Sequence, residues 1–138
     1  MLLDTHVWVW AVGRDTRLGR RARRRLETAS TRPGGLAIAS VSIFEVAALQ
    51  VAGRLRLAMP VEQWIREAIE RPALRVFDLD QTAAADAGLV PALELSDPID
   101  RCLVAVARSQ RRLLVTADRQ ILDYAARTRL VTVVDARH

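Results

Sequence analysis

Short apolar runs alternate along this chain with longer stretches in which apolar residues recur every three or four positions. The runs have the length of buried strands, and the longer stretches have the periodicity of amphipathic helices. The expected strands are Met1–Leu3, Leu36–Ala39, Leu74–Leu79, Leu113–Thr116 and Leu130–Val134. The expected helices are 5–13, 17–30, 43–52, 61–70, 82–87, 98–110 and 119–127. This alternation predicts an α/β fold with a parallel sheet covered by helices.

Length and composition narrow the class of protein. The 138 residues fit one domain, residues 1–138, and 51% of them are hydrophobic, which argues against disorder. No apolar run approaches the roughly 18 residues that span a membrane. The first residues make a poor signal peptide, because Asp4 interrupts them and no basic residue precedes them. The single cysteine, Cys102, cannot form an internal disulfide, and we expect a cytoplasmic protein.

The positive charge is concentrated in one segment. The net charge is +5, and all 21 basic residues are arginines. Residues 14–32 carry a net charge of +6, and the rest of the chain carries −1. Such a patch suits nucleic acid, but it also suits a solvated helix face opposite an apolar stripe. The candidate RNA-contacting residues are Arg20, Arg21, Arg23, Arg24 and Arg25.

Acidic residues follow the predicted strands at the end where parallel sheets bind ligands. Asp4 comes directly after the first strand, and Asp118 follows the fourth. Glu45 lies in the helix after the second strand, while Asp97 and Asp100 begin the apolar helix at 98–110. Asp80, after the third strand, is a weaker position. The topology therefore predicts a group of carboxylates at one edge of the sheet.

Helix capping offers a simpler interpretation of each acid. Asp97 suits an N-cap, and Pro98 suits the first helical position. Ser42 and Glu45 form the S-x-x-E pattern of a capping box. The acids after the first and fourth strands can cap the following helices, because a helix N-terminus favours negative charge. Capping and clustering both remain open from the sequence.

A cluster of carboxylates would need neutralisation, because like charges disfavour each other's ionised forms. Hard divalent cations do this well, and all-oxygen ligands suit Mg²⁺ or Mn²⁺. Carboxylate-bound Mg²⁺ is used in phosphodiester chemistry. The absence of lysine excludes a phosphate-binding P-loop. The two histidines, His6 and His138, and the lack of a G-x-S-x-G elbow argue against Ser-His-Asp chemistry.

Four motifs in register resemble the PIN-domain ribonucleases, and most closely the VapC-type toxins of toxin–antitoxin pairs. They are LLDTHVWVW, SVSIFEVAALQVAGRLRL, DPIDRCLVAVA and LLVTADRQILDY, and they cover essentially the whole chain. The resemblance implies a three-layer α/β/α sandwich with a mainly parallel sheet of about five strands. It also implies Mg²⁺- or Mn²⁺-dependent RNA cleavage, homodimerisation, and inhibition by a VapB-type antitoxin.

The resemblance also implies roles for individual residues. The catalytic and metal-binding acids would be Asp4, Glu45, Asp100 and Asp118. The auxiliary residues would be Asp97, Thr5, Thr116 and Arg101. The chain departs from the family in having LELS where close relatives often carry histidines, and Phe44 where tryptophan is usual before the glutamate. These departures leave RNA choice and pocket lining open.

The sequence leaves three functional hypotheses. In the first, the carboxylates hold one or two metal ions that activate water, while arginines of residues 14–32 grip the phosphates flanking the cleaved bond. The second is a non-catalytic nucleic-acid-binding module whose acids only cap helices. The third is a structure-specific DNA nuclease, which the small size disfavours. The tryptophans Trp8, Trp10 and Trp64 are expected in the core or at a partner contact.

Overall fold

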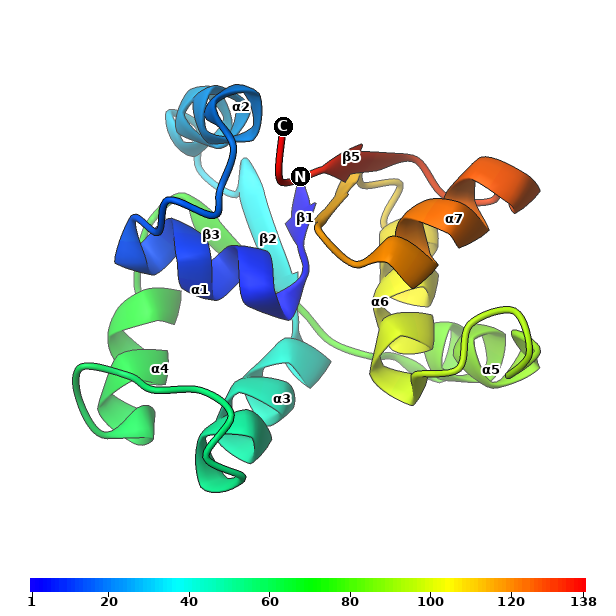
Figure 1. The fold of residues 1–138 in the computed structure, drawn as a ribbon, viewed down its shortest axis with the longest axis horizontal. Coiled ribbons are helices and arrows are strands. Elements are labelled where there is room, and N and C mark those ends of the chain that lie inside the picture. Colours follow the sequence, from blue (N-terminus) through cyan, green and yellow to red (C-terminus); the bar gives the residue numbers. More distant parts are fainter.

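A five-stranded sheet runs through the centre of the molecule, and the computed structural model describes all residues, 1–138. The strands are β1 (Leu2–Leu3), β2 (Leu36–Ala39), β3 (Leu74–Phe77), β4 (Leu114–Thr116) and β5 (Val133–Asp135). Their order across the sheet is β3-β2-β1-β4-β5, and every neighbouring pair is parallel. The parallel sheet predicted from the alternating pattern is therefore confirmed (Figure 1).

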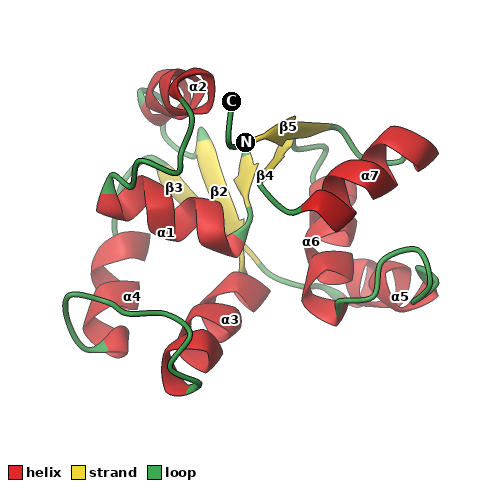
Figure 2. Cartoon of the chain, viewed as in Figure 1, coloured by secondary structure: helices red, strands yellow, loops and turns green.

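Helices cover both faces of this sheet, as Figures 1 and 2 show. They are α1 (Thr5–Gly13), α2 (Arg20–Ser30), α3 (Ser40–Val51), α4 (Val61–Ile69), α5 (Gln81–Leu89), α6 (Pro98–Ser109) and α7 (Arg119–Thr128). α1, α2 and α4 lie over one face and α5, α6 and α7 over the other, with α3 beside the point where β1 and β2 end. The three-layer α/β/α sandwich is confirmed. No helix of the structure has the length and apolar character that a membrane span requires.

Two hydrophobic cores form because successive strand residues point to opposite faces of the sheet. Leu2 lies in the core under α5, α6 and α7, and Leu3 lies in the core under α1, α2 and α4. In the second core the rings of Trp8 and Trp64 meet edge to face with centroids 4.8 Å apart. All three tryptophans are buried, which confirms that they are core residues.

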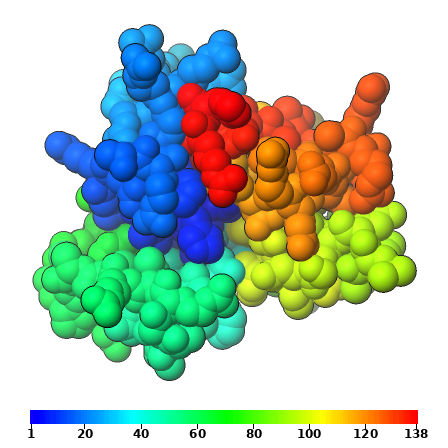
Figure 3. All heavy atoms as spheres, in the orientation of Figure 1, coloured from blue at the N-terminus to red at the C-terminus, as the bar shows by residue number.

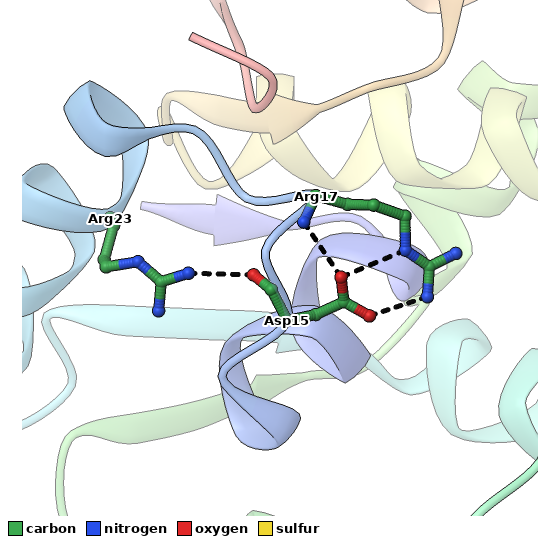
Figure 4. A network of polar contacts seen from close by, with 3 residues as sticks. All are labelled: Asp15, Arg17 and Arg23. Carbon is green, nitrogen blue, oxygen red and sulfur yellow. Dashed lines mark hydrogen bonds and ion pairs between the residues drawn. The ribbon is translucent and has the colours of Figure 1, made fainter.

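The second helix begins later than its periodicity predicts. The expected start was residue 17, but α2 starts at Arg20 after the N-cap Gly19. Arg17 instead closes a turn: its guanidinium holds both carboxylate oxygens of Asp15 at 3.1 and 2.7 Å (Figure 4). These hydrogen bonds hold the pKa of Asp15 at about 2. Arg23 of α2 donates to the Asp15 carbonyl oxygen at 2.8 Å, and the Asp15 amide donates to the Trp10 carbonyl oxygen of α1 at 2.9 Å. The loop between α1 and α2 is therefore bonded to both helices.

The third helix begins earlier than expected, at Ser40 rather than residue 43. β2 passes directly into α3 with Ala39 as the N-cap and no side-chain capping bond. Ser42 therefore lies inside the helix, and its buried hydroxyl has no hydrogen-bond partner. The capping box predicted for Ser42 and Glu45 is wrong, because a box requires the serine at the N-cap.

The end of the chain returns to the first helices. β5 starts at Val133 rather than at residue 130, because α7 ends in a left-handed cap at Arg129 and a short turn follows. After β5, the amide of Gly19 donates to the Ala136 carbonyl oxygen at 2.8 Å. Figure 3 shows these last residues, in red, packed beside the blue segment that contains α1 and α2.

Candidate active site

Two acids stand at the ends of the central strands. Asp4 follows β1 and is buried, and its amide donates to the Val115 carbonyl oxygen of β4 at 3.0 Å. Thr116 Oγ1 donates to Asp4 Oδ2 and accepts from the amide of Asp118 at 3.0 Å. The buried Thr116 hydroxyl therefore joins the two acids. Burial raises the pKa of Asp4, and the hydrogen bond from Thr116 opposes this rise.

Glu45 approaches from α3, which begins where β2 ends. Its side chain is half-buried, and burial raises its pKa. The hydroxyl of Thr5 and the ring of His6 lie near enough to lower that pKa, while the charge of Asp97 raises it further. The Thr5 hydroxyl is buried and makes no hydrogen bond of standard geometry. Glu45 therefore shares its surroundings with the start of α1 and with the N-terminus of α6.

Asp100 occupies the first turn of α6, which is anchored by buried residues from Leu103 to Ala107. Its carboxyl group makes no hydrogen bond, and its pKa is raised to about 8. Burial is the largest cause. The remaining causes are the charges of Asp97, Asp118, Glu45 and Asp4, in decreasing order. Four of the other acids selected from the sequence therefore lie near enough to Asp100 to raise its pKa, whereas Asp80 is not among them.

Helix capping accounts for three of these acids and not for the other two. Asp4 accepts from the Val7 amide at 2.9 Å, Asp97 from the Ile99 amide at 2.8 Å, and Asp118 from the Gln120 amide at 2.7 Å. Glu45 and Asp100 cap nothing, yet they are partly buried beside like charges. This arrangement opposes ionisation, so stability alone does not explain it.

The donor set fits a hard divalent cation. It consists of carboxylate oxygens with raised pKa values and the unpartnered hydroxyl of Thr5, and such oxygens suit Mg²⁺ or Mn²⁺. No group of three or more histidine, cysteine, aspartate or glutamate side chains is arranged closely enough to coordinate an ion directly. Coordination would require side-chain rotation or bridging water, and Mg²⁺ usually keeps several waters.

Two further residues lie close to these acids in the sequence, Arg101 and His6. Arg101 does not bridge the carboxylates: it forms no ion pair with an acid, and its Nη1 points toward the Val90 carbonyl oxygen at 3.5 Å. His6 is exposed and lowers the pKa of both Asp4 and Glu45. Its position two residues after Asp4 is the signal that could have placed it beside the site.

The arginines of α2 are not gathered around the carboxylates. Arg20 and Arg21 are exposed at the start of the helix, and Arg23 is tied to the Asp15 carbonyl oxygen. Arg24 and Arg25 line a cleft that also includes Met1 and Gly35. Met1 and Gly35 precede β1 and β2, so this cleft lies at the amino edge of the sheet, opposite the acids.

The chain matches the family model described as the PIN domain over residues 1–127. It is 35% identical over 121 residues to Ribonuclease VapC22 of Mycobacterium tuberculosis, with 88% of each sequence covered. Among solved structures it is similar to the DNA-bound VapBC of Salmonella typhimurium, at 20% identity and a TM-score of 0.65, covering 97% of this chain and 96% of that one. It is also similar to VapBC2 of Rickettsia felis, at 16% identity and a TM-score of 0.66, covering 96% of each.

These matches confirm the resemblance stated from the four motifs, and the parallel sheet agrees with the fold of the solved structures. The acids at the carboxyl edge come from the same motifs that carried the resemblance. The chain belongs to the PIN-domain family, among its VapC-type members.

Proposed function

We propose that this protein is a metal-dependent endoribonuclease and the toxin of a VapBC-type pair, inhibited by a cognate antitoxin. The observation that carries the proposal is the partly buried Asp100, which lies without a hydrogen bond among four other carboxylates. The similarity to a protein named Ribonuclease VapC22 supports RNA as the substrate. The similarity to VapBC complexes supports a VapB-type partner.

Each acid has a part in this proposal. Asp4, Glu45, Asp100 and Asp118 would hold Mg²⁺, or Mn²⁺ in its place, directly or through water. When bound, the ion would lower the pKa of a bound water and offset charge on the cleaved phosphate. Asp97 caps α6 and so holds Asp100 at the site, while Thr116 fixes the orientation of Asp4. One carboxylate would orient the attacking water and accept its proton.

The proton on Asp100 makes this chemistry depend on pH. With a pKa of about 8 in the metal-free protein, the carboxyl is mostly protonated at neutral pH. A metal ligand must be ionised, so ion binding releases this proton. The exposed ring of His6 lies near two of the carboxylates, where it can help to balance their charge. Cleavage should therefore rise as the pH increases toward 8.

The partner surface proposed for the chain lies on α3. Phe44 and Val51 are 65% and 84% exposed, although they are large and apolar. Surfaces of this kind mark protein contacts, and we assign this one to a second copy of the chain or to the antitoxin. A homodimer and an antitoxin complex use different partners, so the mass of the purified protein distinguishes them.

One PIN domain over residues 1–138 and a cytoplasmic location remain predictions.

The test is cleavage of a structured RNA pool by the antitoxin-free protein in Mg²⁺, in Mn²⁺ and in EDTA. Asp4→Asn and Asp100→Asn should remove metal-dependent cleavage. Asp80→Asn is the matched control, because Asp80 caps α5 through the Ala83 amide at 2.8 Å and is not among the charges that raise the pKa of Asp100.

The alternatives predict other results. Intact RNA binding without cleavage under either metal would favour the non-catalytic binding module. Cleavage of flapped DNA in preference to RNA would favour the structure-specific DNA nuclease. Equal loss of activity in the Asp80 variant would show that the loss is not specific to the carboxylate cluster, because asparagine caps a helix about as well as aspartate does.

A further inference from the structure

The amino edge of the sheet carries a cationic cleft that the carboxylate chemistry does not use. It has a volume of about 600 Å³, and four arginines line it: Arg24, Arg25, Arg32 and Arg112. Met1, Gly35 and Arg112 all lie just before strands, which fixes the cleft at the edge where strands begin. The acids follow the ends of the same strands. Met1 and Asp4 are three residues apart along β1, which at the strand rise separates the two edges by about 10 Å.

A second cleft continues this one along the same edge. It has a volume of about 370 Å³, and it shares Arg112 with the first cleft and adds Arg108 and Arg111. No aspartate or glutamate lines either cleft. The structure therefore separates its charges, with the carboxylates at one edge of the sheet and a band of guanidinium groups at the other.

The arginines of this band form no ion pair with an acid of the chain. The structure contains three ion pairs, which join Arg17 to Asp15, Arg127 to Glu94, and His138 to Asp135. None of them involves an arginine of either cleft. Unpaired like charges held close together repel one another, so a ligand that brings negative charge would bind them favourably.

The shared arginine is held in place by the fold. Arg112 is half-buried, and its Nη1 donates to the Gly34 carbonyl oxygen at 3.2 Å. Its guanidinium carbon lies 5.3 Å from the centroid of the Phe77 ring, and that of Arg75 lies 5.0 Å from the same ring. Cation–π contacts of this kind restrain a side chain that would otherwise move freely. The band is therefore partly organised before any ligand arrives.

The wall of the first cleft depends on a glycine turn. Gly34 has φ +64, in the left-handed region, and a Cβ on Gly35 would overlap the carbonyl oxygen of Ala29. The turn brings the end of α2 close to the start of β2, so Arg24, Arg25 and Arg32 face the same space as Arg112. A turn with a side chain at position 35 could not approach the helix so closely.

We propose that this amino-edge band is a second nucleic-acid site, which binds backbone phosphates apart from the carboxylates. Guanidinium groups match phosphate oxygens through paired hydrogen bonds, and phosphate contacts need no particular base. Two of the ten residues lining the first cleft are hydrophobic, whereas peptide grooves rely on apolar anchors. The site needs no metal and does not depend on catalysis, although for the proposed ribonuclease it would hold RNA away from the point of cleavage.

The test is the affinity of a fluorescein-labelled single-stranded RNA of about 20 nucleotides, measured by anisotropy in EDTA, where metal-dependent cleavage cannot occur. The variant is Arg24→Glu with Arg25→Glu, since both side chains are exposed and make no hydrogen bond or ion pair. The control is Arg54→Glu with Arg56→Glu, which changes the net charge equally at another exposed pair. A thermal melt confirms that both variants fold.

The cleft variant should bind RNA at least about tenfold more weakly, with a salt dependence reduced by about 1 to 1.5 in log–log slope, while the control changes less than about threefold. Equal losses in both variants would overturn the proposal, because net charge alone would then explain binding. Unchanged affinity in the cleft variant would also overturn it. Competition by polyaspartate as strong as by RNA, at equal charge, would refute the assignment to phosphates.

The metal-dependent cleavage assay is a separate measurement. Loss of binding in the cleft variant of a protein that cleaves no RNA would support this site and refute the proposed ribonuclease. If cleavage depends on Asp100 but the cleft variant binds RNA normally, the proposed ribonuclease is supported and the amino-edge site is refuted.

Discussion

Replacing Asp100 by asparagine removes one charge from the carboxylate cluster and leaves the size of the side chain unchanged. The pKa of Asp100 is raised from 3.8 to about 8, first by burial and then by the neighbouring acids. Between these two values the native protein keeps a proton that the unfolded chain has released. Stability of the metal-free protein therefore falls as the pH rises from about 4 to about 8, and levels off above that. Asparagine carries no such proton, so Asp100→Asn should remove this part of the fall.

The size of the effect follows from the pKa. Each tenfold change in acidity is worth about 1.4 kcal/mol, so the full rise corresponds to about 6 kcal/mol as an upper limit. Asp100 is partly exposed, and water screens its interaction with the exposed Asp97 and Asp118. We therefore expect the variant to be about 1–3 kcal/mol more stable than the wild type at pH 8, with a smaller difference at pH 5.

The assay is urea unfolding in EDTA at several pH values between about 5 and 8.5, followed by tryptophan fluorescence, since Trp8 and Trp64 are buried. Asp80→Asn serves as the control, because asparagine caps a helix about as well as aspartate does. A variant that is less stable than the wild type at pH 8 would refute the reasoning. So would a variant whose stability falls with pH as steeply as that of the wild type, although some fall should remain because burial also raises the pKa of Asp4 and Glu45.

Three further results are expected. Millimolar Mg²⁺ should raise the melting temperature of the wild type more at pH 8 than at pH 6, because ion binding displaces the Asp100 proton, and an equal rise at both pH values would contradict this coupling. Thr116→Val should lower the free energy of unfolding in urea by about 1–3 kcal/mol and reduce cleavage, because it removes the donor to Asp4 and the acceptor for the Asp118 amide. Unchanged stability would show that this hydroxyl is dispensable. Phe44→Glu should shift the mass in light scattering from dimer to monomer, whereas Leu93→Glu, at a more exposed apolar position elsewhere, should not. A dimer that survives the Phe44 change would place the interface off α3.

The carboxylate cluster could be predicted because its members directly follow strands. In a parallel sheet every strand ends at the same edge, so the order of apolar runs placed Asp4 and Asp118 together without knowledge of their side-chain directions. Thr116 was named from the family motif alone, and its hydrogen bond to Asp4 gives a physical reason for a hydroxyl at this position. The sequence interpretation was therefore most accurate where topology alone decides position.

The errors arose where the exact start of a helix decides the role of a residue. The S-x-x-E pattern of Ser42 and Glu45 is the same whether the serine caps the helix or lies within it. Only the absence of a loop after β2, which starts α3 at Ser40, excludes the capping box. The position of the arginines depends on a related feature: α2 leads back to the start of β2, so Arg24 and Arg25 in the middle of α2 reach the amino edge. Attention to the direction of this crossover could have placed them.

The bond between Thr116 and Asp4 joins residues that lie 112 positions apart in the chain. Contacts over such long separations form late and slow the folding of a domain. During synthesis, Asp4 leaves the ribosome long before β4 exists to pair with β1 and before Asp118 can join the cluster. The site is therefore assembled only when nearly the whole chain has been made, and a nascent or truncated chain that ends before β4 should be inert. The order of synthesis therefore delays assembly of the carboxylate site until the chain is nearly complete.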